Sequence, residues 1–90
     1  MKRVHIFIRG RVQGVFFRAN IQQRAVELDL KGYAQNCESD VVECVFEGDD
    51  EDIEEILEFC HEGPRKAKVR DVEVIEEKYE GEFDNFEVRV

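Results

Sequence analysis

The beginning of the chain alternates between apolar and other side chains and then changes to a longer period. Val4, Ile6 and Ile8 are separated by single residues, and a period of two places all three on one face of a β-strand. From residue 17 the apolar positions recur at helical spacing, as Phe17, Ile21, Ala25 and Leu28. This pattern predicts an amphipathic helix. We expect the helix to end between residues 30 and 32, where Gly32 is able to terminate it.

The middle of the chain predicts two strands and a second helix. Residues 33–37 and 41–47 have strand character and are separated by the polar turn 38–40, which is the pattern of a hairpin. A helix beginning after Gly48 places four apolar residues on one face, namely Ile53, Ile56, Leu57 and Cys60. We expect this helix to end at Gly63-Pro64.

The last third of the chain predicts two more strands. A strand between residues 67 and 79 shows partial alternation, with an irregularity expected near Ile75, and residues 86–90 alternate cleanly. The order is β-α-β-β-α-β with a short terminal addition, which is that of a ferredoxin-like α+β sandwich with two helices on one face of an antiparallel sheet. Right-handed crossovers place the first and third strands side by side at its centre. We expect one domain over residues 1–90.

Composition and charge narrow the possible functions. The chain has 90 residues, 42% of them hydrophobic, with seven Phe and one Pro, as expected of a globular domain rather than a disordered one. Its net charge of −9 counts against a nucleic-acid partner. The apolar runs are too short for a signal peptide or a membrane span. Positive residues nevertheless gather early in the chain, at Lys2, Arg3, Arg9, Arg11 and Arg18.

The three cysteines do not form a metal or disulfide pattern. Cys37, Cys44 and Cys60 are odd in number and contain no Cys-x-x-Cys pair. Neither a zinc site nor a disulfide framework is indicated, so we expect reduced thiols and a cytoplasmic location.

The segment between the first strand and the first helix is the main candidate for a binding site. It reads Gly10-Arg11-Val12-Gln13-Gly14-Val15-Phe16-Phe17-Arg18, with a glycine expected at each bend. Glycines allow successive backbone N–H groups to converge on an anion at the positive end of a helix. A cation near the helix start, such as Arg18, is disfavoured unless an anion lies beside it. The segment matches neither the Walker pattern nor the dinucleotide fingerprint, and an ordinary connector has the same features.

A second candidate is Asn36, at the end of the second predicted strand. Its side chain offers an acceptor and two donors, which suits it to hold a water molecule without exchanging protons. Asparagine near a turn is also a common turn residue. The position alone therefore leaves both interpretations open.

Taken together, these segments resemble a known family. The segment at 10–18, followed by Lys31-Gly32-Tyr33-Ala34-Gln35-Asn36, is similar to the two signatures of the acylphosphatases. The resemblance continues in order along nearly the whole chain, through Val42-Glu43, Glu47-Gly48, Gly63-Pro64, Ala67, Val69, Val72 and Phe86. Two positions depart from the usual pattern: Ser39-Asp40 stands where Asp-Gly is common, and Phe16 stands where many members have glycine. A non-glycine residue in the turn costs about 1 kcal/mol if the backbone there needs a positive φ.

The resemblance implies an enzyme that hydrolyses the carboxyl-phosphate bond of small acyl phosphates to carboxylate and inorganic phosphate. It implies that the loop binds the phosphoryl oxygens through residues Gln13, Gly14, Val15, Phe16, Phe17 and Arg18. By the same resemblance Arg18 and Asn36 are catalytic, Arg18 through its charge and Asn36 by orienting the attacking water. No metal or cofactor is implied. We expect a monomer that binds an acyl phosphate, and phosphate or a similar anion as product or inhibitor, but no nucleic acid and no membrane.

Two other function classes fit the same fold. One is a non-enzymatic binding module, either an anion sensor or a partner-binding subunit in which the altered Ser39-Asp40 turn has degraded catalysis, although the presence of both Arg18 and Asn36 argues against it. The other is an RNA-binding sheet, which requires exposed aromatic residues on the central strands and a basic face.

Overall fold

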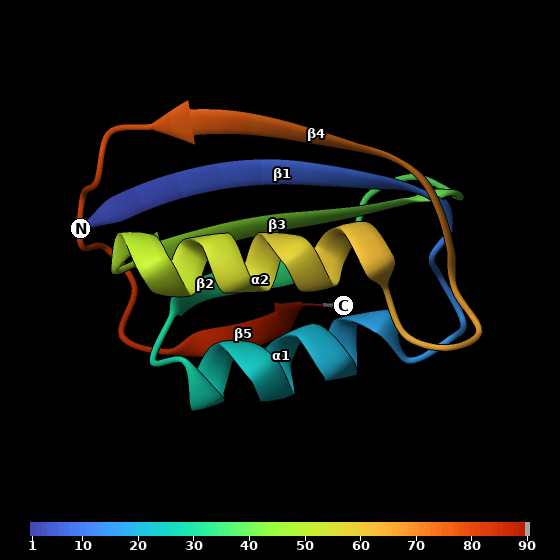
Figure 1. Cartoon of the computed structure of the whole chain (residues 1–90), viewed down its shortest axis with the longest axis horizontal. Helices are drawn as coiled ribbons and strands as arrows, with labels where there is room; N and C mark the ends of the chain where they lie inside the picture. Colours follow the sequence, from blue (N-terminus) through green and yellow to red (C-terminus); the bar gives the residue numbers. More distant parts are fainter. Residues whose placement is uncertain (90) are drawn as a thin grey trace.

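Residues 1–89 are described by a computed structural model, in which a five-stranded sheet carries two helices on one face (Figure 1). The elements in chain order are β1 (Lys2–Arg11), α1 (Phe17–Glu27), β2 (Lys31–Asn36), β3 (Val41–Gly48), α2 (Asp50–Glu62), β4 (Lys68–Glu77) and β5 (Phe86–Arg89). Val90, the last residue of the predicted final strand, lies outside the described residues. Neither helix in this part of the chain is long and apolar enough to cross a membrane.

The sheet has the predicted topology with one addition. Its strand order is β4-β1-β3-β2-β5, so the first and third strands lie side by side at the centre, and both neighbours of β1 run antiparallel to it. The predicted hairpin of β2 and β3 is also antiparallel. The short strand β5 pairs parallel to β2, which makes the sheet mixed at this edge. The ferredoxin-like α+β fold is confirmed.

The core lies between the helices and the sheet face beneath them. Val4, Ile6 and Ile8 of β1 are fully buried, as the alternation predicted. Both helices bury the predicted faces through residues Phe17, Ile21 and Ala25 of α1 and residues Ile53, Ile56 and Cys60 of α2. The apolar pattern therefore determines which side of each element faces inward.

The end of α1 differs from the prediction. The helix ends at Glu27, and the left-handed residue that follows is Asp29, with φ 57°. The Leu30 N–H donates to the Ala25 carbonyl at 2.8 Å and the Asp29 N–H to the Val26 carbonyl at 3.1 Å, as in a Schellman motif. Gly32 lies in β2 instead, where a Cβ atom would come within 1.8 Å of the Val45 carbonyl oxygen.

A bulge between β1 and β4 also corrects two expectations. Gly10 is not at a bend of the loop but inside β1, which continues to Arg11. The register shifts after Arg9 because Arg9 pairs with Asp71 and Gly10 with Val69. The irregularity of β4 therefore lies at residue 70, and the prediction near Ile75 was wrong, since Ile75 pairs regularly with His5.

The face of the sheet opposite the helices carries a network of charges. The Arg3 guanidinium lies 3.1 Å from Glu47 and 2.9 Å from Glu77. The ring nitrogens of His5 lie 2.6 Å from a carboxylate oxygen of Glu43 and 3.1 Å from one of Glu77. Carboxylates thus surround Arg3 and His5, and the described part of this face does not carry the excess of positive charge that the RNA-binding hypothesis requires.

Candidate active site

The loop between β1 and α1 is fixed at both ends by buried side chains. Val12 and Phe17 are each 1% exposed, and between them Gly14 and Phe16 are exposed. Both exposed residues have left-handed backbones, with φ 72° at Gly14 and φ 60° at Phe16. The loop therefore bends twice over a few residues while its ends remain anchored in the core.

The backbone of this loop and of the following helix start is rich in free donors. The turn, loop and cap hydrogen bonds within residues 1–89 include none donated by the N–H groups of residues 13–18. Phe16 is the N-cap of α1 and provides no side-chain cap, and the first turn contains no acidic residue. These unpaired N–H groups and the helix dipole together make the site attractive to an anion.

Arg18 lies in the first turn of α1, and its guanidinium group is oriented by the last strand. Its Nη1 donates a hydrogen bond to the backbone carbonyl of Arg89 at 2.7 Å. The salt bridges of the described residues do not include Arg18. A half-buried guanidinium held by a neutral acceptor keeps its full charge available to a ligand.

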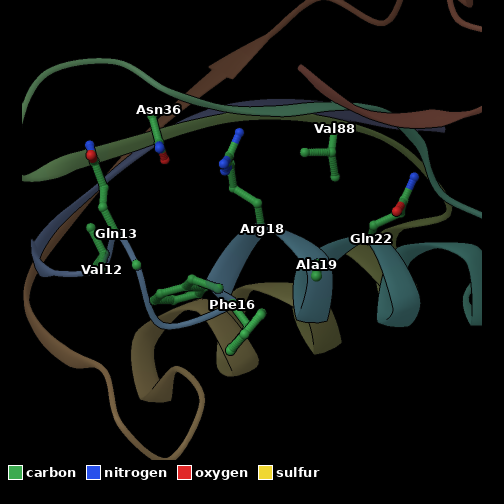
Figure 2. Close-up of a pocket in the computed structure, with 10 residues that line it drawn as sticks. Val12, Gln13, Phe16, Arg18, Ala19, Gln22, Asn36 and Val88 are labelled. Atoms are coloured by element: carbon green, nitrogen blue, oxygen red, sulfur yellow. The ribbon is translucent and has the colours of Figure 1, made fainter. Parts of the chain in front are cut away.

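Asn36 lies across the cavity from the loop, as the last residue of β2. It has the same strand parity as the buried Ala34, so it is on the side of the sheet that faces the helices. Figure 2 shows the Arg18 and Asn36 side chains extending into the same space between α1 and the sheet. Two residues eighteen positions apart in the sequence are thereby brought to one site.

Gln13 connects the loop to the hairpin that follows Asn36. Its Nε2 donates to the carbonyl of Val41 at 2.9 Å and also to the carbonyl of Glu38. The turn is closed by the Cys37 N–H, which donates to the Val41 carbonyl at 2.9 Å. Among residues 1–89 only Phe16 and Asp29 combine a side chain with a positive φ. The Ser39-Asp40 turn is therefore free of the strain that its departure from Asp-Gly suggested.

These elements surround a cavity of about 470 Å³. It is lined by Val12, Gln13, Gly14, Phe16, Phe17, Arg18, Ala19, Gln22, Asn36 and Val88. All the predicted site residues except Val15 contribute to this lining, whereas Val15 packs against the core. Among the described residues that line the cavity, Arg18 is the only one with an ionisable side chain.

Four lining residues were not among the predicted site residues, namely Val12, Ala19, Gln22 and Val88, and Val12 directly precedes the predicted 13–18 loop. Ala19 and Gln22 lie next to Arg18 on α1, and their helical spacing was a usable signal. Val88 shares a strand face with the buried Phe86, but its place opposite α1 depends on the parallel pairing of β5 with β2. That pairing had no local signal in the sequence.

The thiols of the described residues do not line the cavity. Cys44 and Cys60 are fully buried, and this burial raises the pKa of both well above the ordinary value. Cys37 is exposed beside Asn36 in the sequence but is absent from the lining. A cysteine nucleophile, which requires an accessible thiolate, is therefore not part of this site.

Comparisons with known proteins find similar sequences and similar structures. Residues 4–88 match the family model described as Acylphosphatase. An acylphosphatase of Haloarcula marismortui is 51% identical over 87 residues, which cover 97% of this chain and 94% of that protein. The crystal structure of the acylphosphatase from Bacillus subtilis has a TM-score of 0.94 at 30% identity, with full coverage of both chains. An acylphosphatase structure from Coxiella burnetii has a TM-score of 0.92 at 36% identity, covering 98% of this chain and 92% of that one. The chain therefore belongs to the acylphosphatase family of enzymes.

Proposed function

We propose that this enzyme hydrolyses small acyl phosphates with the phosphoryl group held by the 13–18 loop and Arg18 and the attacking water oriented by Asn36. The observation that carries the proposal is the composition of the cavity. Within residues 1–89 its lining combines one cation and a run of free backbone donors with an asparagine on the opposite side, and includes no side chain suited to proton transfer.

The phosphoryl oxygens are the groups that this arrangement recognises. The loop N–H groups and the Arg18 guanidinium donate hydrogen bonds to them, and the charge that spreads over these oxygens in the transition state strengthens the same contacts. The carbonyl of Arg89 aims Arg18 in advance, so little reorganisation is needed during the reaction.

The chemical step needs no general acid from the protein. The Asn36 side-chain oxygen accepts a hydrogen bond from water, and the water oxygen attacks phosphorus in line with the leaving carboxylate. The bond between phosphorus and the bridging oxygen breaks with its electron pair on the carboxylate, and the water proton passes to a phosphoryl oxygen. Carboxylate and dihydrogen phosphate are the products. A carboxylate leaves readily without protonation, which is why a cavity with only Arg18 as an ionisable side chain suffices.

The test is hydrolysis of benzoyl phosphate by the purified protein with EDTA present, followed by ultraviolet absorbance. We expect Arg18→Ala to raise KM and to lower kcat, since a charge-assisted contact is worth about 1.5–3 kcal/mol in binding and about 3–4 kcal/mol in a transition state. Asn36→Ala is expected to lower mainly kcat. Arg18→Lys is expected not to restore activity, because an ammonium group lacks the planar fork.

The matched control is Lys78→Ala, which removes an exposed positive charge outside the cavity; Lys78 follows Glu77, which pairs with Arg3, at the opposite end of β1 from the 13–18 loop. It is expected to leave both constants within about twofold, because the Debye length of about 10 Å screens a distant exposed charge. Full kcat/KM in either site variant refutes the role assigned to that residue. A folded wild-type protein without turnover refutes the proposed reaction and favours a non-catalytic anion-binding module.

We also propose that the enzyme works as a monomer in the cytoplasm. Its three free cysteines support a reducing compartment, and its net charge of −9 opposes self-association. Sedimentation at two concentrations tests the first point, and a mass that increases with concentration contradicts it.

A further inference from the structure

Phe16 combines two features that the fold does not require. Its side chain is 81% exposed, and its backbone has φ 60° and ψ 25°, a left-handed conformation that is a rare outlier for a bulky residue. The backbone N–H of Asn20 donates to the Phe16 carbonyl at 3.0 Å, and the Asn20 side chain donates to the same oxygen at 2.8 Å. Both bonds hold the main chain and are available to any residue at this position. An exposed aromatic side chain at a strained N-cap therefore does not serve the stability of the loop.

The cavity is larger than the group that its polar part recognises. Its volume of about 470 Å³ falls within the range of roughly 300–1,000 Å³ that accommodates whole small molecules, and a phosphoryl group fills only a small part. In Figure 2, Gln13 and Asn36 lie on one side of Arg18, and Ala19, Gln22 and Val88 lie on the other. The remaining space is thus bordered largely by apolar atoms and is open to the acyl group.

Phe16 is placed to contact an acyl group that extends out of this space. It lines the cavity, and Ala19, one helical turn further along α1, presents only a methyl group beside it. The side-chain amide of Gln22 is engaged with the main chain of β5, since its Nε2 donates a hydrogen bond to the Phe86 carbonyl at 3.2 Å. The small side chain at Ala19 leaves room in front of the Phe16 ring, and an aromatic ring offers a flat apolar surface at little entropic cost.

We infer that Phe16 is a specificity-determining residue for the acyl group, and that this enzyme prefers acyl phosphates whose acyl group is aromatic or extended and apolar. The inference rests on the proposed reaction, because it assumes that the phosphoryl group occupies the loop between Gln13 and Arg18. The orientation of the substrate then follows: the phosphoryl end is inside the cavity and the acyl end lies against Phe16 at its mouth.

The experiment compares kcat/KM for benzoyl phosphate with kcat/KM for acetyl phosphate in four proteins. In the wild type we expect the ratio to favour benzoyl phosphate, and in Phe16→Ala we expect it to fall about tenfold, the lower end of what one missing apolar contact changes. Phe16→Tyr is expected to retain the wild-type ratio because it keeps the ring. Val26→Ala is the matched control, since Val26 is an exposed apolar residue of the same helix that does not line the cavity.

A fifth protein, Phe16→Gly, separates specificity from folding. Glycine removes the ring and also relieves the left-handed backbone, so we expect this variant to fold at least as stably as the wild type and to show the same tenfold loss of selectivity. Calorimetric binding of phenylphosphonate and methylphosphonate provides a readout without turnover, and we expect the preference for the phenyl compound to decrease in parallel.

A ratio that stays within twofold of the wild type in both Phe16→Ala and Phe16→Gly overturns the inference while leaving the proposed reaction intact. An equal loss for both substrates also overturns it, since that result assigns Phe16 to the shape of the phosphate loop. Failure of the wild type to hydrolyse either substrate overturns the proposed reaction instead, so the two failures are distinguishable.

Discussion

Replacement of Glu47 tests how the segment between β4 and β5 is held on the sheet. Glu47 lies on the face opposite the helices and its side chain is only 2% exposed. Its Oε2 accepts hydrogen bonds from Arg3 Nη1 at 3.1 Å and from the backbone N–H groups of Glu80 at 3.1 Å and Gly81 at 3.2 Å. One carboxylate oxygen thus joins β1, β3 and the segment that carries the chain from one edge of the sheet to the other (Figure 1).

The cost of Glu47→Ala follows from the partners that it leaves behind. Arg3 retains Glu77 as a partner, but the N–H groups of Glu80 and Gly81 lose a charged acceptor, and a hydrogen bond to a charged group contributes about 1.5–3 kcal/mol. We therefore expect a loss of about 3–4 kcal/mol of unfolding free energy. This is a large fraction of the roughly 5–15 kcal/mol that holds a typical domain.

Urea unfolding followed by circular dichroism measures this loss as a decrease of the midpoint at an unchanged m-value. Glu47→Gln keeps an acceptor oxygen for the two N–H groups, so we expect its loss of unfolding free energy to be about half that of Glu47→Ala. Glu54→Ala removes an exposed carboxylate from α2 and is expected to change the unfolding free energy by less than about 0.5 kcal/mol.

Amide hydrogen exchange of Glu80 and Gly81 gives a local readout, because these N–H groups are expected to lose protection in Glu47→Ala. The reasoning fails if Glu47→Ala costs less than about 1 kcal/mol while both amides stay protected. That result means that other contacts anchor the crossing segment.

Two further predictions concern the stability in acid of the sheet face opposite the helices and the reactivity of the thiols. Burial acts to raise the pKa of Glu43, but hydrogen bonds, led by the one from His5, outweigh it and leave the pKa below its ordinary value of 4.5. The stabilisation that ionised Glu43 gives the folded state is therefore complete above pH 4.5 and is lost as pH falls through the lowered pKa. Between about pH 6 and about pH 3 the urea midpoint is accordingly expected to fall less in Glu43→Gln than in the wild type, and an equal fall in both proteins contradicts this. A chromogenic disulfide reagent is expected to titrate only the exposed Cys37 rapidly in the folded protein, and two or three fast thiols contradict the burial of Cys44 and Cys60.

The sequence was sufficient to predict the inward face of an element wherever its local apolar pattern agrees with the burial in the structure. The alternation of Val4, Ile6 and Ile8 and the helical spacing of Phe17, Ile21 and Ala25 predicted the inward faces, because an apolar stripe must be covered by the rest of the fold. The central position of β1 and β3 followed from the sequence of elements and the handedness of crossovers, whereas the place of β5 beside β2 did not.

The features that were missed depend on contacts between distant segments. Gly10 looks like a loop residue until β4 lies beside it, where a Cβ atom would meet the Lys68 carbonyl oxygen at 2.2 Å. Gly32 was predicted to end a helix, although Asp29 performs that role and Gly32 instead allows close approach to β3. A glycine signals an unusual backbone in each case, but only the neighbouring strand determines which one.

The position of the candidate site was predicted from the sequence, but the hydrogen bonds that hold its residues in place were not. The 13–18 loop and Asn36 were located from motifs, and their roles in the reaction stay predictions. Gln13 was predicted as part of the loop that binds the phosphoryl oxygens, and no role was predicted for its side chain, which bridges two carbonyl oxygens of the β2–β3 turn. An amide side chain has four hydrogen-bonding positions, and the sequence alone does not show which partners satisfy them.

The hydrogen bond from Arg18 to the Arg89 carbonyl joins residues that are 71 positions apart. During synthesis the ribosome releases the chain from its first residue onward, and α1 emerges long before β5. The guanidinium has no orienting carbonyl until residue 89 has left the exit tunnel and β5 has paired with β2. Under the proposed mechanism, the nascent protein is accordingly expected to become competent for catalysis only when β5 joins the sheet.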